Sequence, residues 1–213
     1  VKDIGTPDRL ERVTKDFLNG VAEQRNLKHK QKCIFLDRDG TINQYVGFLR
    51  SKDQMVLERG AAEAIRTINE SEYLAIVITN QPVIARGECS YEDLDQIHNH
   101  MYTLLGNEGA YVDGLYFCPH HPDKGFEGEV KELKIECDCR KPKIGMLNQA
   151  EIDFNVDLKN SWFIGDTTID VQTGKNAKMH TVMLKSGDSN KGKFQVKPEI
   201  IADNLLDAVK KIL

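Results

Sequence analysis

Short apolar runs, each ending in polar residues, recur along the chain. The first run, from Cys33 to Leu36, is continuously apolar rather than alternating, which is typical of a parallel strand buried on both faces. The pattern predicts strands over residues 33–37, 74–79, 113–117, 161–165 and 180–184.

Segments with helical periodicity separate these runs. Ser90 and Asp93 form a capping-box pattern, after which apolar residues recur at helical spacing as far as Leu105. His98 and His100 lie on this helix, and we interpret both as ordinary helix residues. Strands that alternate with helices predict a three-layer, doubly wound α/β fold with a parallel sheet. No segment between the strands is long enough for a large cap domain.

Composition limits the function classes. At 213 residues, the chain is long enough for one well-buried core with an appendage. A net charge of −4 gives no electrostatic attraction to nucleic acid or anionic membranes, so neither is expected as a partner. No apolar run approaches transmembrane length, and the N-terminus lacks an apolar signal core. Together with the five cysteines, which fit a reducing compartment, these features predict a cytoplasmic protein.

Two carboxylates, Asp37 and Asp39, directly follow the first apolar run. Because side chains alternate along an extended chain, both leave the strand end on the same side, while Arg38 points elsewhere. Ligands of open α/β sheets bind beyond the carboxyl ends of the strands, which makes this pair a candidate site. Taken alone, Asp-x-Asp-Gly is equally typical of a solvated turn.

Polar residues at further strand ends favour the site interpretation. A Thr-Asn-Gln triplet starting at Thr79 follows the second run, and Asp166 follows the fourth, with Asp170 four residues later. Arg140 and Lys141 stand between them, directly before a helix-like segment. In content and order, these motifs resemble the haloacid dehalogenase (HAD) superfamily of phosphohydrolases over the chain from Lys32 to the C-terminus.

Further motifs narrow the resemblance within that superfamily. The segments 35–43 and 84–87, with a Cys/His cluster before Arg140-Lys141-Pro142, resemble the D-glycero-D-manno-heptose 1,7-bisphosphate phosphatases. The histidinol-phosphate phosphatases share the cluster and the Arg-Lys-Pro, but segment 84–87 and Gly145-Met146 favour the heptose family. This resemblance implies removal of the 7-phosphate of the sugar bisphosphate, in nucleotide-heptose synthesis for lipopolysaccharide or another surface polysaccharide.

The strand-end residues suit phosphoryl transfer. We assign Asp37 as the nucleophile that forms an aspartyl-phosphate, and Asp39 as the acid and base, with a pKa raised by its neighbours. Thr79 and Lys141 supply a hydroxyl and a positive charge for the phosphoryl oxygens. Arg140 either holds a second substrate phosphate through its planar guanidinium or faces solvent.

Two anions that face a phosphate require a cation among them. Mg²⁺ prefers hard oxygen ligands, which the carboxylates of Asp37 and Asp166 and the main-chain carbonyl of Asp39 supply. Asp170 either ligates the ion as well or orients its ligands. The family motifs add a substrate-binding set, which consists of Tyr45, Val46, Gly47, Phe48, Asn80 and Gln81.

A second constellation, Cys118-x-His120 followed by Cys137-x-Cys139, offers three thiolates and one imidazole. Four such ligands leave no place for water, which indicates a structural Zn²⁺ rather than a catalytic one. The loop between them is short and polar, so a metal would supply the stability that a core does not. Scattered free thiols are the alternative. His121 competes with His120 as the ligand, and the family resemblance selects His120.

Three residues depart from the heptose-family pattern. Pro82 and Val83 stand where a small polar residue and a glycine are usual, and Thr167 stands where a lysine is common. We expect effects on substrate affinity and anomer preference rather than on the reaction. A non-catalytic sugar-phosphate-binding scaffold is the alternative from another class. The presence of both Asp37 and Asp39 weighs against it, because two repelling carboxylates would weaken simple binding of an anion.

Residues 1–31 lie outside the phosphatase match, which leaves 32–213 as the phosphatase domain with its zinc loop 118–139. The segment starts a helix at Thr6-Pro7, and its apolar face needs a partner surface; that face consists of Leu10, Val13, Phe17, Leu18 and Val21. Residues 3–7 also resemble the closing segment of sugar-phosphate nucleotidyltransferases. Two interpretations stay open: a helix packed on the domain's own helices, or a helical appendage that is the remnant or linker of a fusion with such an enzyme.

Overall fold

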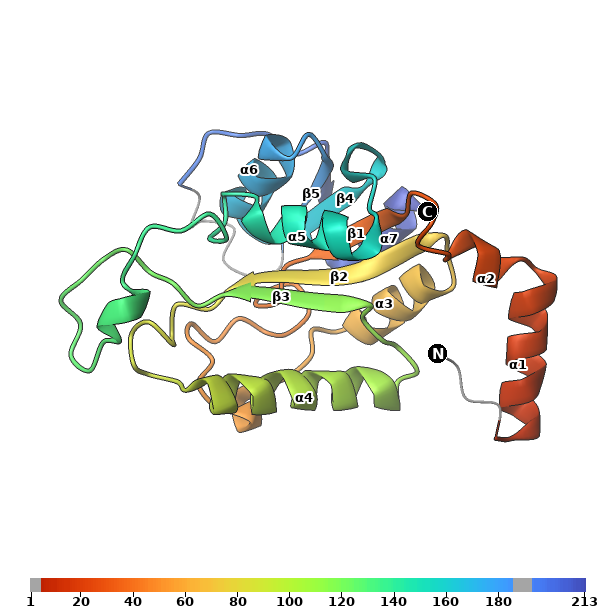
Figure 1. Cartoon of the computed structure of the whole chain (residues 1–213), viewed down its shortest axis with the longest axis horizontal. Coiled ribbons are helices and arrows are strands. Elements are labelled where there is room, and N and C mark those ends of the chain that lie inside the picture. The colour runs from red at the N-terminus through yellow and green to blue at the C-terminus, as the bar shows by residue number, and fades with distance from the viewer. Residues whose placement is uncertain (1–4, 186–192) are drawn as a thin grey trace.

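Six strands form the middle layer of the structure, a computed structural model that describes residues 5–185 and 193–213. They are β1 (Lys32–Leu36), β2 (Tyr73–Asn80), β3 (Gly114–Cys118), β4 (Trp162–Gly165), β5 (His180–Leu184) and β6 (Ile200–Ala202). All neighbouring strands are parallel, in the order β3-β2-β1-β4-β5-β6 (Figure 1). The five predicted strands are confirmed to within about one residue at each end. The prediction lacks β6, because three residues are too few to show a period.

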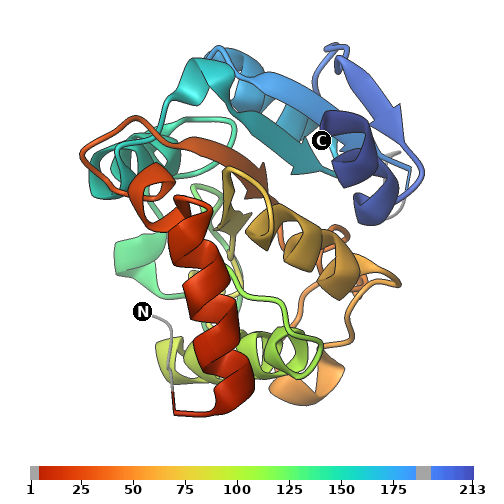
Figure 2. The ribbon, with the colours of Figure 1, turned by 90° about the vertical axis from the view of Figure 1, so that its right-hand side faces the viewer.

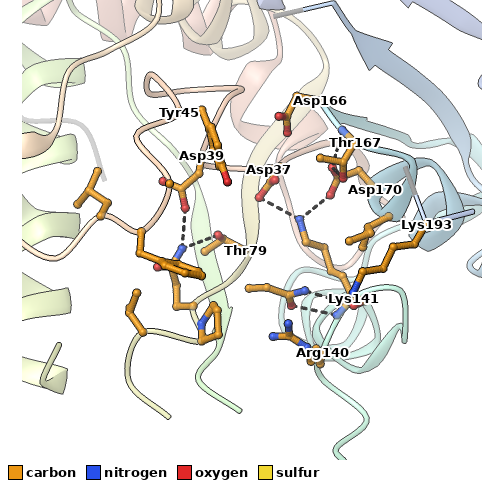
Figure 3. A pocket seen from close by; sticks show the side chains of 18 residues that line it. Asp37, Asp39, Tyr45, Thr79, Arg140, Lys141, Asp166, Thr167, Asp170 and Lys193 are labelled. Carbon is orange, nitrogen blue, oxygen red and sulfur yellow. Dashed lines mark hydrogen bonds and ion pairs between the residues drawn. The ribbon is translucent and has the colours of Figure 1, made fainter. Parts of the chain in front are cut away.

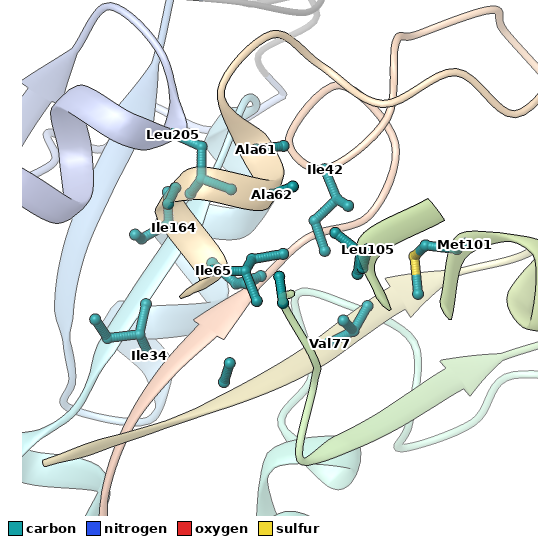
Figure 4. Packing of buried hydrophobic residues seen from close by; sticks show 14 of the residues in the cluster. Ile34, Ile42, Ala61, Ala62, Ile65, Val77, Met101, Leu105, Ile164 and Leu205 are labelled. Carbon is teal, nitrogen blue, oxygen red and sulfur yellow. The ribbon is translucent and has the colours of Figure 1, made fainter. Parts of the chain in front are cut away.

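Helices cover both faces of this sheet, as the alternation of elements predicts. On one face lie α3 (Ala61–Asn69), α4 (Tyr91–Asn107) and α7 (Leu205–Ile212); on the other lie α5 (Gly145–Phe154) and α6 (Thr168–Asn176) (Figure 1). Alternate residues of β1 join the two sides. Ile34 and Leu36 pack into the cluster with α3, α4 and α7, and Cys33 and Phe35 pack with α5. Figure 4 shows Ile34 in the first of these clusters. The three-layer, doubly wound α/β fold is therefore confirmed.

Among the described residues, loops rather than a cap domain extend beyond the carboxyl ends of the strands. The segment 118–139 projects from that end of the molecule as a long loop (Figure 1). Short 3-10 helices interrupt the connections; these are η1 (Lys52–Gln54), η2 (Lys131–Leu133) and η3 (Leu158–Asn160). None of the helices in residues 5–185 and 193–213 is long and apolar enough to span a membrane.

The register of the central strands brings the predicted site residues to one edge. Leu36, the last residue of β1, pairs with Val77 of β2 and with Ile164 of β4. The residues that follow each of these three positions therefore emerge side by side. The strand order also reverses between β1 and β4, and such a switch point opens a crevice at the carboxyl edge of the sheet.

The N-terminal segment forms α1 (Pro7–Leu18) and the short α2 (Val21–Gln24) at the opposite end of the molecule (Figures 1 and 2). Thr6 caps α1, as predicted, by accepting a hydrogen bond from the Arg9 amide. The apolar face of α1 is exposed, and Phe17 and Leu18 retain 75% and 76% of their accessible surface. Two residues of the nucleotidyltransferase-like segment, Asp3 and Ile4, lie outside the described residues.

One glycine sets how closely α6 approaches the sheet. A Cβ atom added at Gly174 would lie 2.5 Å from Cγ2 of Thr181 and 3.1 Å from Cβ of Phe163. We expect Gly174→Ala to lower the free energy of unfolding by about 1–3 kcal/mol through overpacking. Gly106→Ala in α4 is the matched control, because a Cβ there meets nothing within 4 Å. It should raise stability by up to about 1 kcal/mol. Urea denaturation measures both, and a Gly174→Ala protein as stable as the parent would contradict this packing.

Candidate active site

The predicted catalytic residues line one pocket of about 250 Å³ at the carboxyl ends of β1, β2 and β4 (Figure 3). Its walls include nearly all the predicted catalytic, substrate-binding and Mg²⁺-binding residues, namely Asp37, Asp39, Tyr45, Gly47, Phe48, Thr79, Asn80, Gln81, Arg140, Lys141, Asp166 and Asp170. Val46 does not line it, and its side chain is exposed. Lys193, which no motif indicated, also lines the pocket.

Lys141 is a buried cation between two carboxylates. Its Nζ atom lies 2.6 Å from Oδ1 of Asp170 and 2.9 Å from Oδ1 of Asp37. Burial alone would lower the pKa of Lys141, but these two carboxylates outweigh it and raise that pKa. Burial raises the pKa of Asp37 to about 7, although the charge of Lys141 opposes the shift. Asn80 fixes the main chain of Lys141 by accepting from its amide and donating to its carbonyl.

Asp39 has its own buried cation. The Arg38 side chain is fully buried, and its guanidinium donates to both carboxylate oxygens of Asp39, at 2.9 Å for Oδ2. Gln81 donates to Asp39 Oδ2 and to the Thr79 hydroxyl. Burial disfavours the ionised carboxylate, yet Arg38 and these hydrogen bonds outweigh it, so the pKa of Asp39 is lowered. The predicted rise in the pKa of Asp39 is therefore wrong. The carboxyl group whose pKa is raised is that of Asp37.

His98 of α4 contacts the guanidinium of Arg38 in this ion pair. Its Nε2 atom lies 3.1 Å from Nη1 of Arg38, and burial lowers the pKa of His98 to about 3. The imidazole is thus neutral and accepts a hydrogen bond from the guanidinium. Our interpretation of His98 as an ordinary helix residue misses this contact. The available signal was its spacing, because His98 follows Leu94 by four residues and precedes Met101 by three, which places it on the buried face.

Three carboxylates can share a metal ion. Oxygens of Asp37, Asp166 and Asp170 lie within 4.8 Å of one another, and all three residues are enclosed. Hard oxygen donors at this spacing fit Mg²⁺. Asp170 Oδ2 also accepts from the amide and the hydroxyl of Thr167, which is the N-cap of α6. Thr167, which stands where the resemblance leads us to expect a lysine, therefore fixes the carboxylate of Asp170.

The Cys/His cluster has the spacing of a tetrahedral site. The Sγ atom of Cys118 lies 3.6 Å from that of Cys137 and 3.2 Å from that of Cys139. His120 Nδ1 lies 3.3 Å from Cys139 Sγ. Zinc–sulfur bonds of about 2.3 Å would give sulfur–sulfur edges of about 3.8 Å, so the four atoms fit Zn²⁺ after a small expansion. His121 does not join them; its Nδ1 accepts from the main chain instead.

Comparisons with known proteins bear on this site. Residues 138–208 match the family described as HAD-hydrolase-like. The D-glycero-beta-D-manno-heptose-1,7-bisphosphate 7-phosphatase of Pasteurella multocida is 41% identical over 74% of this chain and 83% of its own length. The enzyme of the same name from Haemophilus ducreyi is 34% identical over 84% of this chain and 97% of its own length.

A solved structure extends the comparison to three dimensions. The D,D-heptose 1,7-bisphosphate phosphatase of B. bronchiseptica, in complex with magnesium and phosphate, superimposes with a TM-score of 0.74. It is 30% identical and aligns with 85% of this chain and 98% of its own. The likeness in fold therefore extends over most of this chain.

The contact between His98 and Arg38 predicts a stability difference. His98→Phe leaves a buried guanidinium N–H without its acceptor, so we expect the free energy of unfolding to fall by about 1–3 kcal/mol. His98→Gln, which supplies a carbonyl oxygen, should lose less. His100→Phe on the same helix is the control and should stay within about 0.5 kcal/mol of the parent. Urea denaturation measures all three. Equal losses for His98→Phe and His98→Gln would show that the hydrogen bond contributes nothing.

Proposed function

Because the chain belongs to the HAD-like family of D-glycero-D-manno-heptose-1,7-bisphosphate 7-phosphatases, we propose that its pocket removes the 7-phosphate of this sugar bisphosphate. One observation carries the proposal: Asp37 and Asp39 line the same pocket, and a buried cation lies 2.9 Å from each, Lys141 and Arg38 respectively. The reaction serves nucleotide-heptose synthesis for a surface polysaccharide, in the cytoplasm.

Asp37 is the nucleophile in this proposal. One of its carboxylate oxygens attacks the phosphorus, and the bond from phosphorus to the sugar oxygen breaks, which leaves an aspartyl-phosphate. Thr79 and Lys141 lie beside Asp37 in the pocket, where they stabilise the charge that develops on the phosphoryl oxygens. Lys141 also favours the ionised, nucleophilic form of Asp37, since a neighbouring positive charge stabilises the carboxylate.

Asp39 moves the protons. It protonates the departing sugar oxygen, then accepts a proton from the water that attacks the phosphorus and releases Asp37 and inorganic phosphate. The lowered pKa of Asp39 suits the second step, because the free carboxylate is the base. For the first step, a phosphate anion bound beside Asp39 raises its pKa by repulsion between like charges. Arg38 and Gln81 hold the carboxylate in place throughout.

The cluster of three carboxylates, from Asp37, Asp166 and Asp170, supports Mg²⁺ as the cofactor. When bound, Mg²⁺ would offset the negative charge that these residues present to a phosphate. Asp37, Asp166 and the main-chain carbonyl of Asp39 are the proposed ligands. Asp170 orients them, because its two oxygens already accept from Lys141 and Thr167.

Substrate recognition follows from the rest of the pocket wall. Arg140 donates to the carbonyl of His120, which holds its guanidinium at the pocket, and Lys193 adds a second positive charge there. These two cations suit the phosphate that is not removed. The loop carrying Tyr45, Val46, Gly47 and Phe48 is the proposed contact for the sugar. Asn80 and Gln81 contribute by fixing Lys141 and Asp39.

The cluster of Cys118, His120, Cys137 and Cys139 is the proposed structural Zn²⁺ site. The metal would close the loop 118–139, whose residues add little to either hydrophobic cluster. For α1, whose apolar face is exposed, we propose the second of the two interpretations: it is a helical appendage, the remnant or linker of a fusion, and a fused or associated sugar-phosphate nucleotidyltransferase is the proposed partner.

Removing the nucleophile tests the proposed reaction. With Mg²⁺ present, Asp37→Asn should lower phosphate release from the heptose bisphosphate by about 10³-fold or more. Asp39→Asn should lower it by about 10²- to 10⁴-fold, the usual contribution of an acid–base group. Asp95→Asn, an exposed carboxylate on α4, is the control and should leave the rate unchanged.

Three results would overturn the proposal. Phosphate release by Asp37→Asn at the parental rate would show that Asp37 is not the nucleophile. A parent that releases no phosphate would favour the non-catalytic scaffold. A parent that hydrolyses histidinol phosphate faster than the heptose bisphosphate would instead favour the related family.

Metal analysis tests the zinc site. We expect about one Zn²⁺ per chain in the purified protein and a large loss of it in Cys137→Ser, because one of four ligands is removed. Cys89→Ser is the matched control, since Cys89 lies outside the cluster and should keep the metal. The melting temperature should fall with the zinc content. Unchanged zinc in Cys137→Ser would refute the assignment.

A further inference from the structure

One cation, Arg86, lies between the aromatic rings of two separate loops. Its Cζ atom is 4.3 Å from the ring centre of Phe48 and 4.4 Å from that of Phe126. Phe48 lines the pocket, whereas Phe126 belongs to the loop 118–139 and does not touch the pocket. Each such contact between a guanidinium and an aromatic face is attractive, and more strongly so when water is excluded.

Stacking, rather than hydrogen bonding, sets the orientation of this guanidinium. Arg86 Nε is buried and donates no hydrogen bond within the described residues. The nearest carboxylate is that of Glu88, at 3.9 Å from Nη1. Glu88 also pairs with Arg50, whose Nε donates to it at 2.6 Å. Arg86 is therefore tied to the loop 44–58 through both an aromatic ring and a shared carboxylate.

The loop 118–139 holds Phe126 firmly. The amides of Gly125 and Phe126 both donate to Oε2 of Glu129, at 2.9 and 3.0 Å. The ring meets Lys134 Nζ at 4.5 Å and the edge of the His121 ring at a centroid distance of 6.1 Å. Two cations and an imidazole thus surround one phenyl ring, in place of the apolar core that this loop lacks.

The turn that carries Arg86 is also joined to this loop through the backbone. Val130 donates its amide to the carbonyl of Ala85, at 3.1 Å. Gly87 approaches so closely that a Cβ atom there would lie 1.9 Å from the carbonyl oxygen of Gly128. A displacement of the loop 118–139 is therefore transmitted to Arg86. The stacking of the Arg86 guanidinium on the Phe48 ring then transmits it to Phe48.

We propose that Arg86 is a positioning residue that couples the metal-binding loop to the sugar-binding wall of the pocket. The fold has no cap domain among its described residues, so irregular loops shape the pocket, and the stack of Phe126, Arg86 and Phe48 fixes one of them. Selectivity for the large sugar substrate then depends on the loop 118–139, although none of the residues 118–139 lines the pocket. This inference rests on the proposed phosphatase function and adds a specificity role to it.

The test replaces Phe126, which lies outside the pocket. Phe126→Leu should raise KM for the heptose bisphosphate by about tenfold, which corresponds to the loss of one partly buried cation–π contact. Its kcat, and its kcat/KM for p-nitrophenyl phosphate, should stay within about twofold of the parent, because the reacting groups are untouched. Phe17→Leu, on the exposed face of α1, is the control and should change neither parameter.

A double-mutant cycle distinguishes coupling from general loosening. Once Phe48→Leu is in place, adding Phe126→Leu should raise KM no further, because the stack is already broken. Arg86→Lys, which keeps the charge but loses the planar face, should reproduce the KM change with both rings intact. It also keeps the test decisive if Phe126→Leu fails to fold.

The contrary outcomes are separate from failure of the proposed function. Additive effects of Phe48→Leu and Phe126→Leu, equal losses on both substrates, or an unchanged KM in Phe126→Leu and Arg86→Lys would each overturn the coupling while the parent remains an active phosphatase. Absence of phosphate release by the parent would instead refute the function on which the inference rests.

Discussion

Pairing of carboxylates with buried cations is the constraint on which the pocket depends. Lys141 is enclosed between Asp37 and Asp170, and the fully buried Arg38 donates a hydrogen bond to the carboxylate of Asp39. Removing such charges from water costs several kcal/mol per ion, so each is tolerated only with a close partner in place. The surrounding elements supply those partners. The segment before α5 delivers Lys141, α4 places His98 behind Arg38, and the N-cap of α6 holds Asp170.

The same pairing explains why the pocket suits a phosphate with a metal ion. Three of its aspartates, Asp37, Asp166 and Asp170, bring carboxylate oxygens within 4.8 Å of one another. A divalent cation held by them would offset the negative charge that they present to a phosphate. The two carboxylates of the β1 end also differ in proton affinity: burial raises the pKa of Asp37, whereas Arg38 and Gln81 keep that of Asp39 low. One motif thus provides two carboxylates in different electrostatic surroundings, and the proposed acid role of Asp39 requires the bound phosphate to raise its pKa.

Much of this could be predicted from the sequence, because parallel strands buried on both faces are continuously apolar and their carboxyl ends meet at one edge. The strands and most of the pocket wall follow from that rule. The rest depends on contacts between segments far apart in the chain. Alternation correctly turns Arg38 away from the pocket, but it cannot reveal that the long side chain returns to Asp39 or that His98 meets it. The stack around Arg86 likewise joins loops that no local pattern relates, and β6 is too short to carry a period.

The proposed chemistry thus lies at strand ends, and the proposed selectivity lies on loops that ion pairs and the proposed Zn²⁺ site hold in place of a core. The central claim is that Asp37 becomes covalently phosphorylated during turnover. Acid quenching within the first turnover, followed by peptide mass spectrometry, tests it most directly. The account predicts one base-labile phosphoryl group on the peptide that contains Asp37. A phosphoryl group on another residue, or none at any quench time while phosphate is released, would contradict it.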